Sequence, residues 1–173
     1  EHRQDSKHES VEDPGSAPLF PELPCMEHVN QGQLGDCYLL AAVASIVRLD
    51  PMHFVNHMID HVDGTVTVRL YADVGLMFEV TVMKSLVFSS SGTRYAKGGM
   101  WVQILEKAYA ASGLQRPIKR QKQKPVDDAP SYDDISGGDA ADAMMHLTGK
   151  PSKSFDLGKG RERFGHEAPH ILE

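Results

Sequence analysis

Residues 30–47, NQGQLGDCYLLAAVASIV, contain the stretch of sequence that decides the fold. The second half is an apolar run that begins after Asp36, a residue type favoured at helix N-caps, and it is closed by Asp50 and Pro51. This pattern predicts a central, buried helix that is apolar on every face. Cys37 lies in the first turn of that helix, and its chemistry is the question that the stretch raises.

Two interpretations of Cys37 follow from its position. Cysteine is among the most buried residue types, and a lone cysteine on an apolar helix is ordinarily part of the packing. At a helix N-terminus, however, the backbone amide dipoles stabilise a thiolate, which is the nucleophilic form. Acyl transfer also needs donors for the oxyanion, and Gln31 supplies a side-chain amide if the turn through Gly32 and Gly35 folds it back over the cysteine.

The rest of the chain predicts an α+β fold. Alternating apolar residues at 65–71 and 77–82 predict an antiparallel hairpin, and apolar residues at helical spacing predict helices at 100–111 and 139–147. A shorter helix is expected at 52–59, and residues 115–134 are expected to form a long surface loop. The expected architecture is therefore a buried helix headed by Cys37, further helices and a small β-hairpin layer.

The composition restricts the classes of function. The chain has 173 residues, 40% of them hydrophobic, which fits one globular domain, and its net charge of −6 argues against binding to nucleic acid. No run of 18 apolar residues is present, so neither a membrane span nor a membrane partner is expected. Two cysteines, Cys25 and Cys37, do not make a disulfide framework, which favours a reducing, cytoplasmic environment.

Three blocks of sequence, in the same order, resemble the catalytic core of the calpains. Residues 31–42, QGQLGDCYLLAA, are similar to the calpain pattern QGxLGDCWxLAA, with Tyr38 in place of the tryptophan. Residues 101–110, WVQILEKAYA, are similar to WxxLLEKAYA, and the SGG and LTG strings at 136–138 and 147–149 resemble the SGG and TGG segments. The chain thus resembles the cysteine-bearing subdomain of a calpain-like, papain-like protease.

The resemblance implies a cysteine endopeptidase that acts on a protein or peptide substrate. Cys37 would be the nucleophile that forms a thioester, and Gln31 would carry the oxyanion role. The backbone of Gly138 would pair with an extended substrate. The residues expected to bind substrate are Gly35, Asp36, Gly137 and Gly138.

The resemblance also divides the chain. Residues 1–16 are polar and are expected to be a flexible leader, and residues 17–157 are expected to form the calpain-like cysteine subdomain. Residues 158–173 are expected to be a C-terminal tail or the start of a second subdomain. Between Ala110 and Ser136 the chain is longer than the calpain pattern, so this loop is interpreted as an insertion.

A cysteine protease also needs a histidine base and an orienting asparagine or aspartate. The calpain segments Gly-His-Ala-Tyr and Asn-Pro-Trp do not occur, and the two asparagines, Asn30 and Asn56, lie too early in the chain to match. His170 has a suitable separation from Cys37, but only three residues follow it. We therefore expect the histidine and asparagine half to come from elsewhere, in cis or in trans, and the chain alone to be weak or inactive. The alternative is a non-catalytic module that binds a peptide or a partner.

Two groups of histidines have the spacing of metal ligands, but other features argue against a metal site in each. Residues 166–170, HEAPH, match the letters of a zinc-protease motif, but Pro169 obstructs the helix that the motif requires. His53, His57 and His61 recur at four-residue spacing, for which a solvated face is favoured over a metal clasp.

Only the resemblance to the calpains suggests a calcium site. In the calpain pattern the acidic ligands lie nine residues before the cysteine and two before the helix tryptophan, and here those positions hold His28 and Gly99. Neither is a hard oxygen ligand, so no metal and no cofactor is expected. Basic residues at 116–124 lie beside acidic residues at 127–134, which favours a solvated, self-compensating loop over a phosphate contact.

Overall fold

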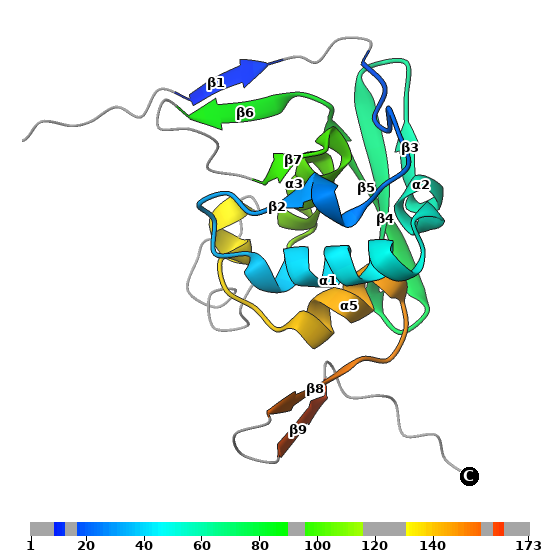
Figure 1. Ribbon diagram of the computed structural model, residues 1–173, viewed down its shortest axis with the longest axis vertical. Coiled ribbons are helices and arrows are strands. Elements are labelled where there is room, and N and C mark those ends of the chain that lie inside the picture. The colour runs from blue at the N-terminus through cyan, green and yellow to red at the C-terminus, as the bar shows by residue number, and fades with distance from the viewer. Residues whose placement is uncertain (1–8, 13–16, 90–95, 116–130, 157–160, 165–173) are drawn as a thin grey trace, which may run out of the picture.

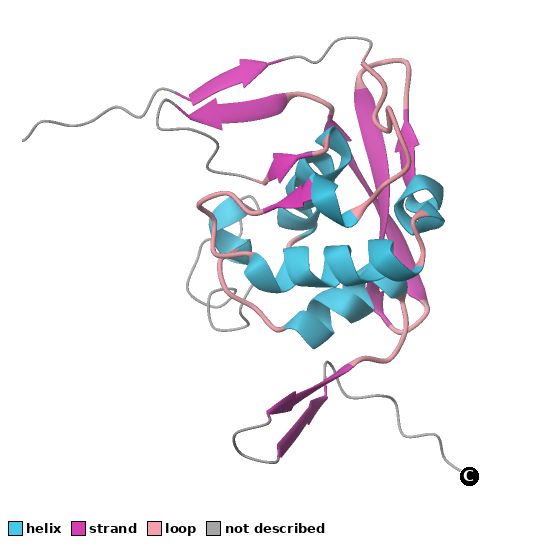
Figure 2. Ribbon diagram, in the orientation of Figure 1, coloured by secondary structure: helices cyan, strands magenta, loops and turns pink. Residues whose placement is uncertain are grey.

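The fold combines helices with antiparallel strands, which confirms the predicted α+β class (Figures 1 and 2). The computed structural model describes residues 9–12, 17–89, 96–115, 131–156 and 161–164.

The central helix α1 spans Cys37–Leu49 and ends where Asp50 N–H donates to Ile46 O at 2.8 Å, as predicted. Most of its apolar side chains are buried in the core. The prediction that every face is buried was wrong. One side of the helix faces solvent, because no described element covers it: the exposed residues are Cys37, Ala41, Ser45, Arg48 and Leu49.

Two further helices confirm the predicted ranges. Helix α3 (Met100–Ser112) lies above α1 in the view of Figure 1, and its Trp101 ring stacks on Phe54 with the ring centroids 5.3 Å apart. Helix α5 (Ala140–Thr148) packs beside α1 and begins where the Asp139 carboxylate accepts the Ala141 N–H at 2.7 Å. These helices enclose the apolar core together with the sheet.

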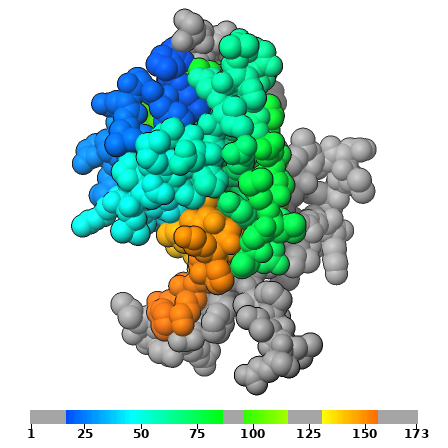
Figure 3. All heavy atoms as spheres, turned by 90° about the vertical axis from the view of Figure 1, so that its right-hand side faces the viewer, coloured from blue at the N-terminus to red at the C-terminus, as the bar shows by residue number. Residues whose placement is uncertain are grey.

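The main sheet has the strand order β3-β4-β5. Strands β4 (Thr65–Asp73) and β5 (Leu76–Met83) form the predicted antiparallel hairpin, and Figure 3 shows this part of the chain beside α1 and α2. The short helix α2 (Met52–His57) ends earlier than predicted. The following residues instead form β3 (Met58–Asp60), because they pair with β4, a long-range contact that local spacing does not encode.

Three two-stranded pairs complete the described part of the chain, and none was predicted. Strand β1 (Glu9–Glu12) pairs with β6 (Leu86–Ser89), so part of the expected leader forms a strand. Strand β2 (Val29–Asn30) pairs with β7 (Lys97–Gly98), directly before the cysteine loop. The third pair joins β8 (Lys153–Asp156) to β9 (Arg161–Phe164), and two 3-10 turns, η1 (Met26–His28) and η2 (Tyr132–Ile135), precede β2 and α5.

Among the described residues, none of the helices combines the length and the apolar character needed to cross a membrane.

Candidate active site

The thiol of Cys37 is free and exposed at the first residue of α1. The Asp36 carbonyl accepts the Leu39 N–H at 2.9 Å and the Leu40 N–H at 3.1 Å, which closes the first turn. The first amides of a helix have no acceptor within it, and their dipoles create a positive potential. The side chain of Cys37 is therefore exposed to solvent beside this positive end of the helix.

A glycine-rich segment, residues 136–138, lies against the cysteine loop, which is the loop of residues 31–36 that precedes Cys37. The Gly137 N–H donates to Gly35 O at 2.8 Å, and Gly137 has a φ of 81°, which a residue with a side chain rarely adopts. The approach is close: a Cβ added at Gly35 would lie 3.0 Å from Ser136 Oγ. The structure thus joins two segments that are about a hundred residues apart in the sequence and that were both predicted to contact substrate.

Tyr38, the residue that departs from the calpain pattern, supports this segment from below. Its hydroxyl donates to Ile135 O at 3.1 Å, and its ring is buried. A Cβ added at Gly138 would lie 2.5 Å from Tyr38 Cζ, so only glycine fits over the ring. The Tyr38 ring therefore determines how closely the Gly137-Gly138 backbone approaches the start of α1.

Gln31 is exposed, and its amide is bonded within its own loop, so its placement over Cys37 stays a prediction. Its Nε2 donates to Leu34 O at 2.8 Å. An amide nitrogen carries two hydrogens, so one donor is used in the loop and the second remains for another acceptor.

Asp36 does not act as its position suggested. It is the N-cap residue of α1, but its side chain makes no cap hydrogen bond and is only 1% exposed. Burial raises the pKa of the Asp36 carboxyl to about 6. Because the carboxyl is buried, a contact of Asp36 with substrate is restricted to its backbone.

Glu106 is a buried acid that the sequence analysis did not single out. It is 1% exposed on α3, and its Oε2 accepts the Ala96 N–H at 2.6 Å. Burial, reinforced by the charge of Asp36, raises the pKa of Glu106 to about 8. The available signal was its spacing, because Glu106 falls on the same helical face as Val102 and Tyr109, which are both buried.

None of the described histidines is hydrogen-bonded to Cys37, and their rings contact other residues instead. The partners are Glu22 and Trp101 for His28, Leu147 O for His53, His53 O and the Tyr71 hydroxyl for His57, Thr67 for His61, and the Tyr109 hydroxyl for His146. The rings of His53 and His57 stack with centroids 4.2 Å apart, and within the described ranges no group of three or more candidate ligands could hold a metal ion. Residues 116–130, His166 and His170 lie outside the described residues.

The positions at which the resemblance placed calcium ligands are bonded to each other. The Gly99 N–H donates to His28 O at 3.1 Å, and Trp101 Nε1 donates to His28 Nδ1 at 3.3 Å. Because Nδ1 accepts, Nε2 carries the hydrogen and donates to Glu22 at 2.9 Å. His28 therefore fills this place with an imidazole that has partners on both sides.

An exposed cysteine at the start of a helix, two residues after Gly35, whose carbonyl accepts the Gly137 N–H, is the arrangement that the resemblance to papain-like cysteine peptidases led us to expect. A comparison with protein families agrees. The sequence profile of the family described as calpain family cysteine protease matches residues 16–171. The chain belongs to this family.

Individual relatives support the same assignment. The chain is 31% identical over 135 residues to the calpain-type cysteine protease DEK1 of Zea mays, and this match covers 75% of the chain and 6% of DEK1. It is 26% identical over 166 residues to calpain-10 of Rattus norvegicus, covering 86% of this chain and 22% of the relative. Calpain-A of Drosophila melanogaster is 28% identical over 159 residues, covering 87% and 17%. The chain thus spans less than a quarter of the length of each of these relatives.

Proposed function

We propose that this chain carries the nucleophile half of a calpain-type endopeptidase site, with Cys37 as the attacking group. The observation that carries the proposal is the exposure of the Cys37 thiol at the start of α1, beside the Gly35 to Gly137 hydrogen bond. Family membership supplies the reaction type, which is hydrolysis of a peptide bond.

The reaction follows from what each group can do. The Cys37 thiolate attacks the carbonyl carbon of the scissile peptide bond, and the negative charge moves to the carbonyl oxygen. The Cys37 N–H and the free Gln31 amide hydrogen are the proposed donors to this oxyanion. The base, which has taken the proton of the Cys37 thiol, returns it to the leaving amine as collapse of the adduct breaks the C–N bond, and a thioester remains. Water then hydrolyses the thioester to a carboxylic acid and restores the thiol.

The substrate would bind in an extended form along the exposed backbone of Gly137 and Gly138. Main-chain hydrogen bonds to an extended peptide give affinity without strong selection for particular side chains. Tyr38 fixes this backbone from beneath, so the peptide carbonyl is held above the head of α1.

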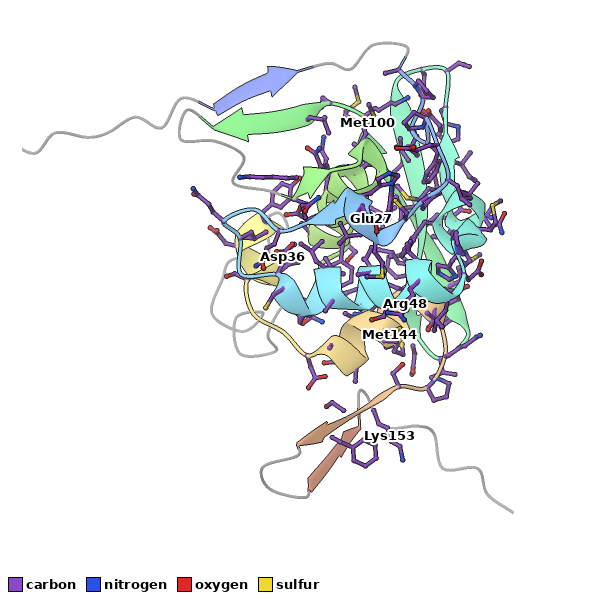
Figure 4. All side chains as sticks on the ribbon, viewed as in Figure 1. Glu27, Asp36, Arg48, Met100, Met144 and Lys153 are labelled. Carbon is purple, nitrogen blue, oxygen red and sulfur yellow. The ribbon has the colours of Figure 1, made fainter. Side chains whose placement is uncertain are left out.

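The base is proposed to come from a second unit that carries histidine and asparagine, in cis or in trans. The solvent-facing side of α1, which includes Cys37, Ala41, Ser45 and Arg48, leaves access for such a unit (Figure 4 labels Arg48). On this proposal the chain alone forms the thioester slowly and turns over poorly.

A non-catalytic binding module is the second candidate. It is favoured by one observation, which is that none of the described histidines is hydrogen-bonded to the thiol. In such a module the same glycine backbone would hold a peptide that is not cleaved.

A peptide bearing an electrophilic trap distinguishes the two candidates. We expect labelling of the wild-type chain and of Cys25→Ala near neutral pH, faster than a free cysteine reacts, and none in Cys37→Ala. Labelling that persists in Cys37→Ala would contradict the nucleophile assignment. Labelling of Cys37 at the rate of free cysteine would favour the binding module.

The oxyanion role needs a separate measurement, made with the histidine-bearing unit of a calpain added. We expect turnover to appear on addition and to fall about 100-fold or more in Gln31→Ala, the loss typical of one oxyanion donor. Gln33→Ala, which alters an exposed neighbouring glutamine, is the matched control. An unchanged rate in Gln31→Ala would remove Gln31 from the mechanism.

A further inference from the structure

Two buried acidic side chains, Asp36 at the N-cap of α1 and Glu106 on α3, interact with each other. Asp36 and Glu106 are each 1% exposed, and Figure 4 marks Asp36 at the N-terminal end of the helix. Both carboxyl oxygens of Asp36 and Oε1 of Glu106 have no hydrogen-bond partner among the described residues. Buried polar atoms are nearly always bonded, so three unpartnered oxygens in one place require an explanation.

Ordinary structural roles do not explain them. The Asp36 side chain does not cap α1, whereas Asp139 at the equivalent position of α5 accepts the Ala141 N–H. Neither acid takes part in an ion pair within the described ranges, where the buried cation Lys84 is bonded to Asp60 at 2.6 Å. A buried carboxylate without a cation or a donor is strongly disfavoured.

The two acids influence each other's protonation directly. The charge of Asp36 favours the protonated form of Glu106, and Glu106 in turn favours the ionised form of Asp36. Two carboxylate oxygens cannot hydrogen-bond without a proton between them, but with one proton they become donor and acceptor. One proton for the pair therefore accounts for the unpartnered oxygens.

The pair connects the parts of the candidate site. The Asp36 carbonyl accepts the first two hydrogen bonds of α1, so the position of Asp36 sets the position of Cys37. Glu106 accepts the N–H of Ala96, the residue directly before β7. Strand β7 pairs with β2, and Gln31 directly follows β2. Both proposed reacting groups are thus tied to this one buried contact.

We propose that Asp36 and Glu106, joined by a single shared proton, are positioning residues that hold the first turn of α1 beneath Cys37. This inference rests on the proposed function, because it concerns the placement of the nucleophile. Loss of the shared proton to solvent leaves two like charges in a dry space. The pair then separates, and a second negative charge lies close to the sulfur.

Other titratable groups on the elements around the pair have partners of their own, remain neutral near pH 8 or, like Lys97, are exposed to solvent. Burial raises the pKa of Tyr38 and of Tyr109 above their usual values. Lys107 of α3 donates to the Met83 and Ser85 carbonyls. The remaining groups are Asp134 of η2, which accepts the Ser131 N–H, His146 of α5, which contacts the Tyr109 hydroxyl, Asp142 of α5, Asp133 of η2, the exposed Lys97 of β7, and His28, which is bonded to Glu22.

The test is the pH profile of Cys37 alkylation by iodoacetamide, measured between pH 6 and 10 in a Cys25→Ala background. In the Cys25→Ala background, which retains Glu106, we expect the alkylation rate to rise with pH less steeply than the ionisation of a single thiol requires. The reason is that a second negative charge forms close to the sulfur as the pH increases. In Glu106→Gln, an amide that can still donate to Asp36, we expect a single-ionisation profile. Normalised at pH 7, the variant should react roughly fivefold faster at pH 9.

Asp36→Asn is the second variant, and it should move the extra inflection to lower pH, because Glu106 then ionises without the opposing charge of Asp36. Glu79→Gln, an exposed acid paired with Arg69, should not alter the profile. Superimposable normalised profiles for the background protein and both pair variants would overturn the inference. Iodoacetamide carries no peptide, so a failed peptide trap with altered profiles would refute the proposed function and leave the pair supported.

Discussion

The buried pair makes a prediction about stability that does not depend on catalysis. The perturbation is Glu106→Gln, whose carboxamide keeps an acceptor for the Ala96 N–H and a donor for Asp36 but cannot ionise. The pKa of Glu106 is raised by burial from 4.5 to about 8. The folded state therefore binds more protons than the unfolded state between these two values. The stability from this group is full below pH 4.5 and is lost as pH rises to about 8.

The magnitude follows from the linkage relation. One proton bound only in the folded state changes the free energy of unfolding by about 1.4 kcal/mol per pH unit. Because Glu106 is already half ionised in the folded state near pH 8, the wild-type chain should lose roughly 2 kcal/mol from this group between pH 6 and pH 8. With a urea m-value of about 1–3 kcal/mol/M, the unfolding midpoint falls by roughly 0.7–2 M relative to Glu106→Gln.

Urea unfolding followed by tryptophan fluorescence measures this difference. Trp101 is the single tryptophan of the chain and is 1% exposed, so its emission reports loss of the core. The quantity to compare is the difference in free energy of unfolding between Glu106→Gln and wild type at pH 6, 7 and 8. This comparison is independent of the variant's absolute stability. Glu79→Gln, on the exposed side of β5, is the matched control and should give a constant difference.

A Glu106→Gln difference that stays constant from pH 6 to pH 8 would refute the reasoning, since it would mean that Glu106 is ionised in the folded state like an ordinary glutamate.

Three further predictions concern individual contacts, and all are checked by urea unfolding. Gly138→Ala should cost about 1–3 kcal/mol and also slow labelling of Cys37 by the peptide trap, because its methyl group would lie 2.5 Å from Tyr38 Cζ; a variant that labels normally would show that the ring does not set this backbone. Asp139→Ala should cost about 1 kcal/mol through loss of the bond to Ala141 N–H, and Asp139→Ser should restore most of it. Lys84→Met should cost about 1 kcal/mol by removing the cation that pairs with Asp60, whose side chain is 31% exposed, whereas the double variant with Asp60→Asn, which keeps an acceptor for the Leu19 N–H, should recover part of that loss, and equal losses in both would contradict a stabilising ion pair.

The helices and the main hairpin could be predicted because their signals are local. The apolar run after Asp36, the N-cap at Asp139 and the alternation in β4 and β5 each fix an element without reference to the rest of the chain. Glycine at the ends of α3 and α5 has a positive φ, as expected of helix C-termini.

The short strand pairs could not be predicted, because pairing depends on a distant partner. Strand β1 is largely polar and pairs with β6 more than 70 residues later. Strands β2 and β7 contribute two residues each, which is too short for an alternation to be read. Similarly, whether a side of α1 is exposed depends on which elements pack against it, and the apolar sequence of the helix does not encode this.

The sequence placed two segments of the candidate site together, but it did not predict the buried acids beside them. The motif placed Cys37, Gly35, Gly137 and Gly138 in one region, and the contact of Gly35 with Gly137 brings their segments together. The inward turn of Asp36 was missed because an aspartate before a helix ordinarily caps it. Its orientation depends on Glu106, which the sequence presents as one more charge in a helix.

The Gly35 to Gly137 hydrogen bond, together with the Tyr38 to Ile135 bond, has a consequence for how the family can vary in length. These two anchors return the chain to the cysteine after the excursion that follows α3. Closing a longer excursion costs entropy that grows only with the logarithm of its length, about 0.6 kcal/mol for each doubling. Residues can therefore be added or removed between the anchors during evolution while the geometry around the sulfur stays the same.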